Sequence, residues 1–151
     1  MSRVPVPAMV LGFAGLLPFL GGALLVMIPP NTVPLYGFTT SDAAGGQEIL
    51  VRYGTIILAF MAGCLWGFAS RHGRRPSWIE LVLSVVPAVG VFLLLGDDPG
   101  LNCSLLGFGF ALLLGIDVIF ARRVIVVYWW LHLRIPLTLI VTTCLFIGAS
   151  A

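Results

Sequence analysis

The chain has 151 residues, of which 60% are hydrophobic and 9% are charged, and its net charge is +2. Soluble domains carry about 25% charged residues, so this chain could not cover itself with polar surface in water, and lipid must be its solvent. The small net charge excludes a nucleic-acid partner. The composition therefore predicts an all-α integral membrane bundle that forms one domain over residues 1–151.

Five apolar runs have about the length needed to cross a hydrocarbon core of about 30 Å. The first and third contain Pro18 and Pro87, where we expect kinks because proline lacks a backbone N–H. The first run is too long for the apolar region of a signal peptide, so we expect it to be retained. The five predicted helices cover residues 7–28, 46–69, 78–96, 101–121 and 126–151.

The second predicted helix is the one on which we expect the others to pack. It repeats small residues at every fourth position, Ala59, Gly63 and Gly67, which lie on one narrow stripe of a helix. Such a stripe lets the backbone of another transmembrane helix approach closely. We therefore predict a close helix neighbour on this stripe, either from this chain or from a partner subunit.

Two local patterns indicate how helices begin. Ser77 and Glu80 have the spacing of a capping box, which predicts the start of the third helix. Glu48 precedes Arg52 by four residues, the favourable order for an ion pair on a helix.

The start of the last helix is open to two interpretations. Residues 124–134 form either a short interfacial helix before a span from Pro136, or the beginning of the span itself, near Val126. A span from Pro136 to Ala151 would be only about 24 Å long, which is short for a bilayer. We prefer the earlier start, which places Arg134 about two turns inside the helix.

Asp117 and Arg134 are charges expected inside the membrane, near the same end of the fourth and fifth helices. A charge in the hydrocarbon region costs about 2.5–3.5 kcal/mol on insertion scales, so it usually faces protein and a partner. We predict an intramembrane ion pair between them. A proton or anion site, and extension of both side chains to the interface, are the two alternatives.

Arginine and tryptophan positions predict the orientation. Arg3 lies at the N-terminus, Arg71, Arg74 and Arg75 lie between the second and third helices, and Arg122 and Arg123 lie between the fourth and fifth. Acidic residues dominate the alternate loops, with Arg52 the only basic residue near them. This asymmetry predicts a cytoplasmic N-terminus and a periplasmic C-terminus. Four tryptophans are expected to anchor the cytoplasmic interface: Trp66, Trp78, Trp129 and Trp130.

No cofactor, metal or catalytic residue is predicted. The three cysteines are far apart in the sequence and have no metal-type spacing with the two histidines. His72 lies in a loop, whereas haem ligands in membrane cytochromes lie within helices. A bound lipid is compatible with the apolar surface.

Several groups of residues together form a pattern. They are Tyr53-Gly54 with Leu58, Phe60, Gly63 and Trp66-Gly67; Ser84 to Pro87; and Trp129 to Thr138. This pattern resembles the YG…LSF.GG..WG, S-V-x-P and W-Y-x-x-L-R-x-x-L-T motifs of the DUF3429 family of transmembrane protein 69-like membrane proteins, with Trp130 where the family usually has Tyr. The resemblance covers nearly the whole chain except residues 31–47. It implies a small polytopic protein of the bacterial or mitochondrial inner membrane and transfers no catalytic residue.

Small loops, few buried charges and abundant small residues favour a non-catalytic accessory or assembly subunit of a larger inner-membrane complex. A respiratory or photosynthetic electron-transport complex is the first to consider, and the expected partners are membrane lipids and other integral membrane subunits. The alternative is a small-solute or ion transporter acting as an oligomer, which would use the proline-containing helices and the Asp117–Arg134 pair. A membrane enzyme acting on lipid or quinone is a third, weaker hypothesis.

Overall fold

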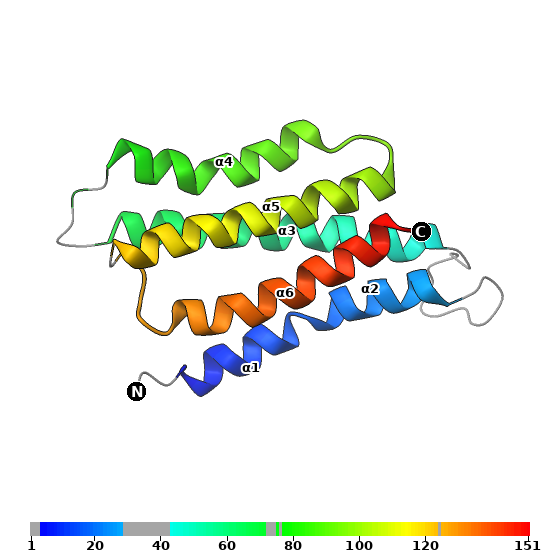
Figure 1. Ribbon diagram of the computed structural model, residues 1–151, viewed down its shortest axis with the longest axis horizontal. Coiled ribbons are helices and arrows are strands. Elements are labelled where there is room, and N and C mark those ends of the chain that lie inside the picture. The colour runs from blue at the N-terminus through cyan, green and yellow to red at the C-terminus, as the bar shows by residue number, and fades with distance from the viewer. Residues whose placement is uncertain (1–3, 29–42, 72–74, 76, 124) are drawn as a thin grey trace.

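A computed structural model describes residues 4–28, 43–71, 75, 77–123 and 125–151. These residues form helices and no strands, and the helices run side by side along the long axis of the molecule (Figure 1). The helices are α1 Val6–Ala14, α2 Leu17–Met27, α3 Ala43–Ala69, α4 Trp78–Leu94, α5 Pro99–Arg122 and α6 Trp130–Ala149.

The lengths of the helices fit a membrane bundle. Among the described residues, four stretches are long and apolar enough to span a bilayer by length and composition: Val6–Met27, Gly45–Ala69, Pro99–Arg122 and Trp130–Ala149. The remaining apolar helix, α4, has 17 residues. The predicted all-α bundle of five membrane helices is therefore confirmed, with α1 and α2 together forming the first span.

The first span is broken where a kink was expected. α1 ends at Ala14, the residue whose carbonyl the ring of Pro18 would meet in a continuous helix, and α2 begins at Leu17. The hydroxyl of Tyr53 on α3 donates a hydrogen bond of 3.1 Å to the carbonyl of Gly15 at this break. Pro87, in contrast, lies inside the uninterrupted helix α4.

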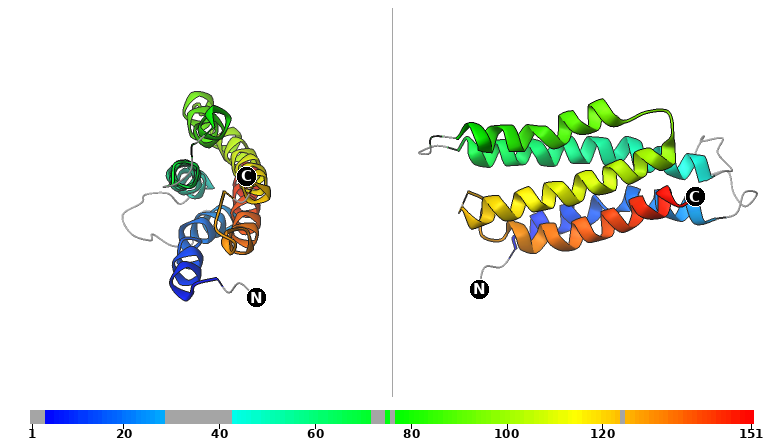
Figure 2. Two further views of the ribbon diagram at one scale, coloured as in Figure 1. Left: turned by 90° about the vertical axis from the view of Figure 1, so that its left-hand side faces the viewer. Right: turned by 45° about the horizontal axis from the view of Figure 1, so that its top comes forward.

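Helix α3 is central, but the face that it buries is not the predicted one. Its buried side chains recur at helical spacing and face the core: Leu50, Leu58, Ala62, Leu65 and Ala69. Figure 2 shows α3 flanked by α2 and α4, with one side left uncovered by the described helices. Ala59, Gly63 and Gly67 lie on the exposed side.

The expectation that a helix of this chain packs on the small-residue stripe is therefore wrong. A Cβ atom built on Gly63 or Gly67 meets nothing within 4 Å among the described residues. The close helix approach uses Gly46 of α3 instead, where a Cβ would lie 2.6 Å from the carbonyl oxygen of Gly22 on α2. The second half of the prediction, a partner subunit on the stripe, remains a prediction.

The last helix begins later than predicted. Residues 125–129 are not helical, and α6 starts at Trp130 rather than near Val126, so neither interpretation of this segment was correct. Ile125 and Val126 are buried, and the backbone N–H of Ile125 bonds to the carbonyl of Phe120. Burying these side chains holds the connection against the bundle, and Arg134 consequently lies about one turn, not two, inside α6.

The local capping predictions hold. Ser77 and Glu80 form the capping box at the start of α4, and Glu48 pairs with Arg52 on the surface of α3. The side chain of Asp98 also caps α5 by accepting hydrogen bonds from the backbone of Gly100 and Leu101.

Candidate functional site

The structure brings Asp117 of α5 and Arg134 of α6 together inside the bundle. The Nε atom of Arg134 donates to Oδ2 of Asp117 at 2.9 Å, and the two side chains are 6% and 1% exposed. Because α5 leads into α6 through a short connection, a residue near the end of α5 meets one near the start of α6. The geometry is that of the ion pair expected from the sequence.

Trp130 completes this cluster. Its Nε1 atom donates to Oδ1 of Asp117 at 2.7 Å, so both carboxylate oxygens have a donor. The guanidinium carbon of Arg134 lies 5.9 Å from the centre of the Trp130 ring, within reach of a cation–π interaction. We refer to Asp117, Trp130 and Arg134 as the buried cluster.

The sequence suggested that Trp130 anchors the chain at the membrane interface, and this prediction is wrong. Trp130 is only 9% exposed, and its N–H points to Asp117 rather than to lipid headgroups. The other three predicted anchors reach the surface to different extents: Trp78 is 84% exposed, Trp66 is exposed and Trp129 is half-buried.

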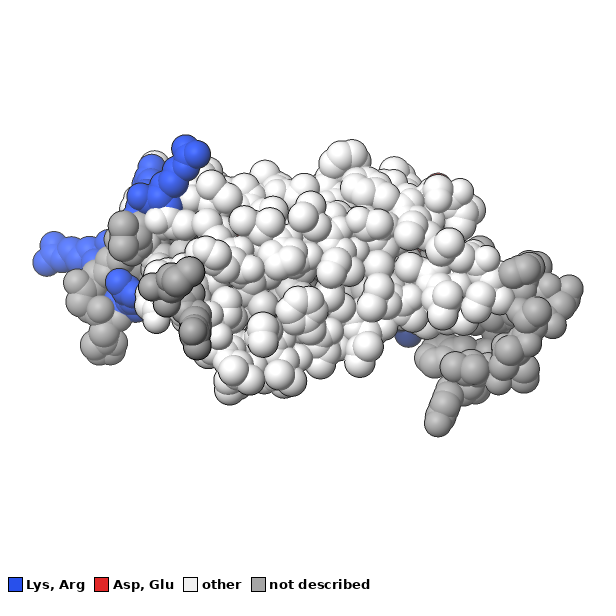
Figure 3. Space-filling view, turned by 60° about the horizontal axis from the view of Figure 1, so that its bottom comes forward, with Lys and Arg blue, Asp and Glu red and all other residues white. Residues whose placement is uncertain are grey.

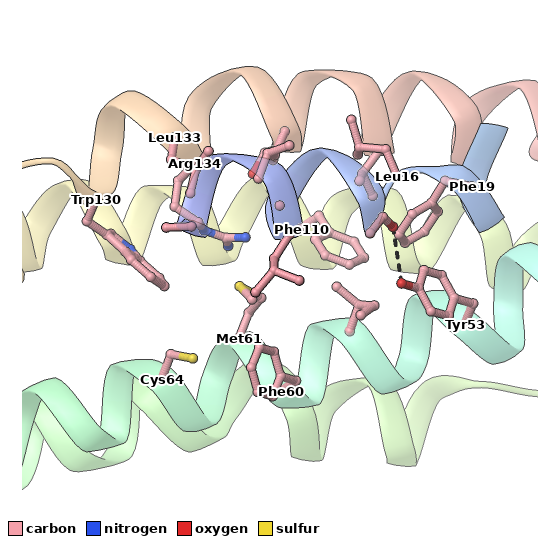
Figure 4. Close-up of a pocket in the computed structure, with 18 residues that line it drawn as sticks. Leu16, Phe19, Tyr53, Phe60, Met61, Cys64, Phe110, Trp130, Leu133 and Arg134 are labelled. Carbon is pink, nitrogen blue, oxygen red and sulfur yellow. Dashed lines mark hydrogen bonds between the residues drawn. The ribbon is translucent and has the colours of Figure 1, made fainter. Parts of the chain in front are cut away.

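A pocket adjoins the buried cluster. It has a volume of about 440 Å³ and lies between the first span, α3 and α6, with Phe110 of α5 at its base (Figure 4). Trp130 and Arg134 belong to its wall, together with Thr138 farther along α6. Most of the wall is apolar, and Tyr53 supplies a hydroxyl group near the break between α1 and α2.

Two polar atoms of this wall are buried without a hydrogen-bond partner among the described residues. They are Nη2 of Arg134 and Oγ1 of Thr138. A buried polar group left unpaired costs about 1–3 kcal/mol, so such groups usually have a role. The pocket therefore combines an apolar wall with two residues whose buried polar atoms lack a partner among the described residues.

Tyr53 and Thr138 belong to the motifs of the family resemblance, but neither was predicted to line a site. One signal could have found Thr138: Trp130, Arg134 and Thr138 are spaced by four residues, so they lie on one face of α6. Tyr53 carried no such signal, because its partner is a backbone carbonyl exposed at a helix break.

The described residues contain no group of three or more His, Cys, Asp or Glu side chains that could hold a metal ion. Cys64, Cys103 and Cys144 are separate free thiols. His72 lies outside the described residues.

The exposed charges are distributed unevenly. Arginines gather at one end of the molecule in the view of Figure 3, with a single basic patch toward the other end. Arg71 and Arg75 follow α3, Arg122 is the last residue of α5 and Arg123 comes directly after it, so these four belong to the end at which α1 begins. Arg3 and Arg74, also used in the orientation argument, lie outside the described residues.

The chain is similar to known membrane proteins. Transmembrane protein 69 of Xenopus tropicalis is 35% identical over 97 residues, which cover 63% of this chain and 34% of the relative. Transmembrane protein 69 of the mouse is 27% identical over 142 residues, which cover 90% of this chain and 52% of the relative. The chain thus spans about half or less of the length of these relatives. No solved structure matches.

The family comparison covers more of the chain. The model of a family described as "Protein of unknown function (DUF3429)" matches residues 4–150, which include all six helices of the bundle and the buried cluster. The chain therefore belongs to the DUF3429 family.

Proposed function

We propose that the chain is a non-catalytic accessory or assembly subunit of a larger complex in a bacterial inner membrane, or in the mitochondrial inner membrane if the chain is eukaryotic. The observation that carries this proposal is the uncovered stripe on α3. Gly63 and Gly67 have no neighbour within 4 Å of a Cβ position, and Ala59 is exposed. A glycine inside a helix is less favourable than alanine by about 1 kcal/mol, and nothing in the described part of this chain offsets that cost.

A partner helix would give these glycines a role. In a bilayer, helix association depends on close van der Waals packing, which small residues permit. The buried acid also fits a non-catalytic protein, because both oxygens of Asp117 already accept hydrogen bonds and the side chain is not available as a base. A respiratory or photosynthetic electron-transport complex is the first setting in which to test the proposal.

Leucine at Gly63 should separate folding from association. Because the position is open, Gly63→Leu should leave the melting temperature of the isolated chain unchanged and should displace the partner helix, so that partner subunits no longer copurify in mild detergent. Gly115→Leu is the matched control, since Gly115 of α5 is equally open. If Gly63→Leu retains the partner subunits in full, the stripe faces lipid and the proposal loses its support.

The alternative function, a small-solute or ion transporter acting as an oligomer, has one observation in its favour. The break at Gly15 adjoins the same pocket as Arg134, so a mobile first span could alter access to a buried charge. The mainly apolar wall of that pocket argues against the passage of hydrated ions.

We further propose that the end carrying Arg71, Arg75, Arg122 and Arg123 faces the cytoplasm, which leaves the C-terminus in the periplasm. In a bacterial host, alkaline phosphatase fused after Ala151 should then be active, whereas the same fusion after Arg75 should be inactive. The reverse pattern of activities would show the opposite orientation.

A further inference from the structure

The pocket beside the buried cluster has a feature that an accessory role does not require. Arg134 and Thr138 are 5% and 3% exposed, and each carries a buried polar atom with no hydrogen-bond partner among the described residues. Both side chains line the pocket. Buried donors without acceptors are unfavourable, so a ligand that supplies an acceptor would remove the penalty.

The two atoms can act on one ligand group. Residues 134 and 138 are four apart on α6, which places their Cβ atoms about 5–6 Å apart on the same face of the helix. Figure 4 shows the Arg134 guanidinium directed into the pocket, toward Phe110. A guanidinium N–H can only donate, and a threonine hydroxyl can donate as well. A single acceptor oxygen that reaches between the two side chains would satisfy both.

The charge balance indicates that this oxygen is neutral. Asp117 already supplies one negative charge to the guanidinium of Arg134, through the contact of 2.9 Å between Oδ2 and Nε. An anionic ligand would lose its hydration and would also be repelled by Asp117. A carbonyl oxygen accepts the same hydrogen bonds without either penalty.

The rest of the pocket fits an apolar body. Phe19, Phe60 and Phe110 contribute to the wall, and the volume of about 440 Å³ falls in the range of ligand pockets, about 300–1,000 Å³. Water alone would fill this space with on the order of ten molecules, each needing two to four polar partners that the wall does not provide.

Access is from the membrane side. Leu11 of α1 and Phe60 of α3 line the pocket and are also 72% and 61% exposed, so they border its mouth on the lipid-facing surface. No residue of α1 is buried. A ligand dissolved in the bilayer can therefore reach the pocket between these two helices.

We propose that this pocket binds a neutral membrane lipid whose polar end is a carbonyl oxygen. The oxygen accepts hydrogen bonds from Nη2 of Arg134 and Oγ1 of Thr138, and the apolar body lies between α1 and α3. Quinones and acylglycerols share this chemistry. The proposal does not depend on any partner subunit.

Native mass spectrometry of the full chain in mild detergent tests this binding. The protein is titrated separately with decylubiquinone, dioleoylglycerol and oleate, and saturable one-to-one binding of at least one of the two neutral lipids is expected, with oleate weaker. The neutral lipid whose binding saturates shows whether the carbonyl belongs to a quinone or to an acylglycerol. Thr138→Val should weaken that binding about fivefold, the effect of one hydrogen bond.

Thr142→Val is the matched control, because the Thr142 hydroxyl bonds to the backbone of its own helix and does not line the pocket. It should bind as tightly as the unchanged protein. Ala8→Phe is a second variant, which fills the pocket from α1, a helix without buried residues, and should reduce binding without changing the melting temperature.

Any one of three results would overturn the proposal. The first is that neither neutral lipid shows saturable binding, and the second is that oleate binds more tightly than both neutral lipids. The third is that Thr138→Val and Ala8→Phe both bind the neutral lipid as tightly as the unchanged protein.

Discussion

Arg134→Leu is expected to destabilise the folded bundle by about 3–5 kcal/mol, because Asp117 would remain buried without its counter-charge. Asp117→Leu should cost a similar amount, since it leaves the guanidinium and the Trp130 N–H without their acceptor. The double variant should recover most of the loss, because an apolar pair needs no desolvation of charge. Unfolding free energies of the four proteins in mixed micelles form the double-mutant cycle that measures this coupling.

The exposed pair on α3 provides the control. Glu48 and Arg52 also form an ion pair, but their side chains are 48% and 77% exposed. Arg52→Gln should therefore change the unfolding free energy by less than about 1 kcal/mol. Losses for Asp117→Leu and Arg134→Leu that simply add in the double variant would contradict the view that these residues act as a pair.

Gly46→Ala should destabilise the bundle although it adds a single carbon atom. The new Cβ would lie 2.6 Å from the carbonyl oxygen of Gly22 and 2.8 Å from the backbone nitrogen of Val26. Both are backbone atoms, so the clash is relieved only if α2 moves away from α3. We expect the unfolding free energy, measured in mixed micelles, to fall by at least the cost of overpacking, which is typically about 1–3 kcal/mol.

Gly63→Ala is the matched control on the same helix. Its Cβ would meet nothing within 4 Å, and alanine is the better helix former by about 1 kcal/mol, so stability should be unchanged or slightly raised. If Gly46→Ala and Gly63→Ala lowered the unfolding free energy equally, the stripe of Ala59, Gly63 and Gly67 would be packed within the chain. The assignment of the buried and exposed faces of α3 would then be wrong.

The spans and the buried pair were predictable for one reason, the absence of water. Lipid forces every backbone group to bond within its helix, so apolar length alone locates the spans. It also makes an isolated charge expensive, so Asp117 and Arg134, near the same membrane surface on successive helices, had to find partners.

The orientation of α3 was not predictable, because core and lipid are equally apolar for a membrane helix. The buried positions Leu58, Ala62 and Leu65 and the exposed positions Ala59 and Gly63 are all small or hydrophobic. Hydrophobic periodicity therefore does not distinguish the two faces, and small residues fit a neighbour from either this chain or another.

Trp130 shows a different limit of the sequence. A tryptophan near a helix end fits an interfacial belt, and that general tendency led to the wrong assignment. Its bond to Asp117 depends on a connection after α5 that is not helical and positions the start of α6 beside the acid. The spacing of Trp130, Arg134 and Thr138 was the one available sign that they share an inward face.

The most direct test of the accessory-subunit proposal is the intact mass of the unmodified chain after extraction in mild detergent, measured by native mass spectrometry. We predict a complex in which this chain is present in fixed stoichiometry with other integral membrane subunits. A chain that is recovered alone, or only with copies of itself and with stability that rises on addition of a solute, would contradict the proposal and favour a transporter.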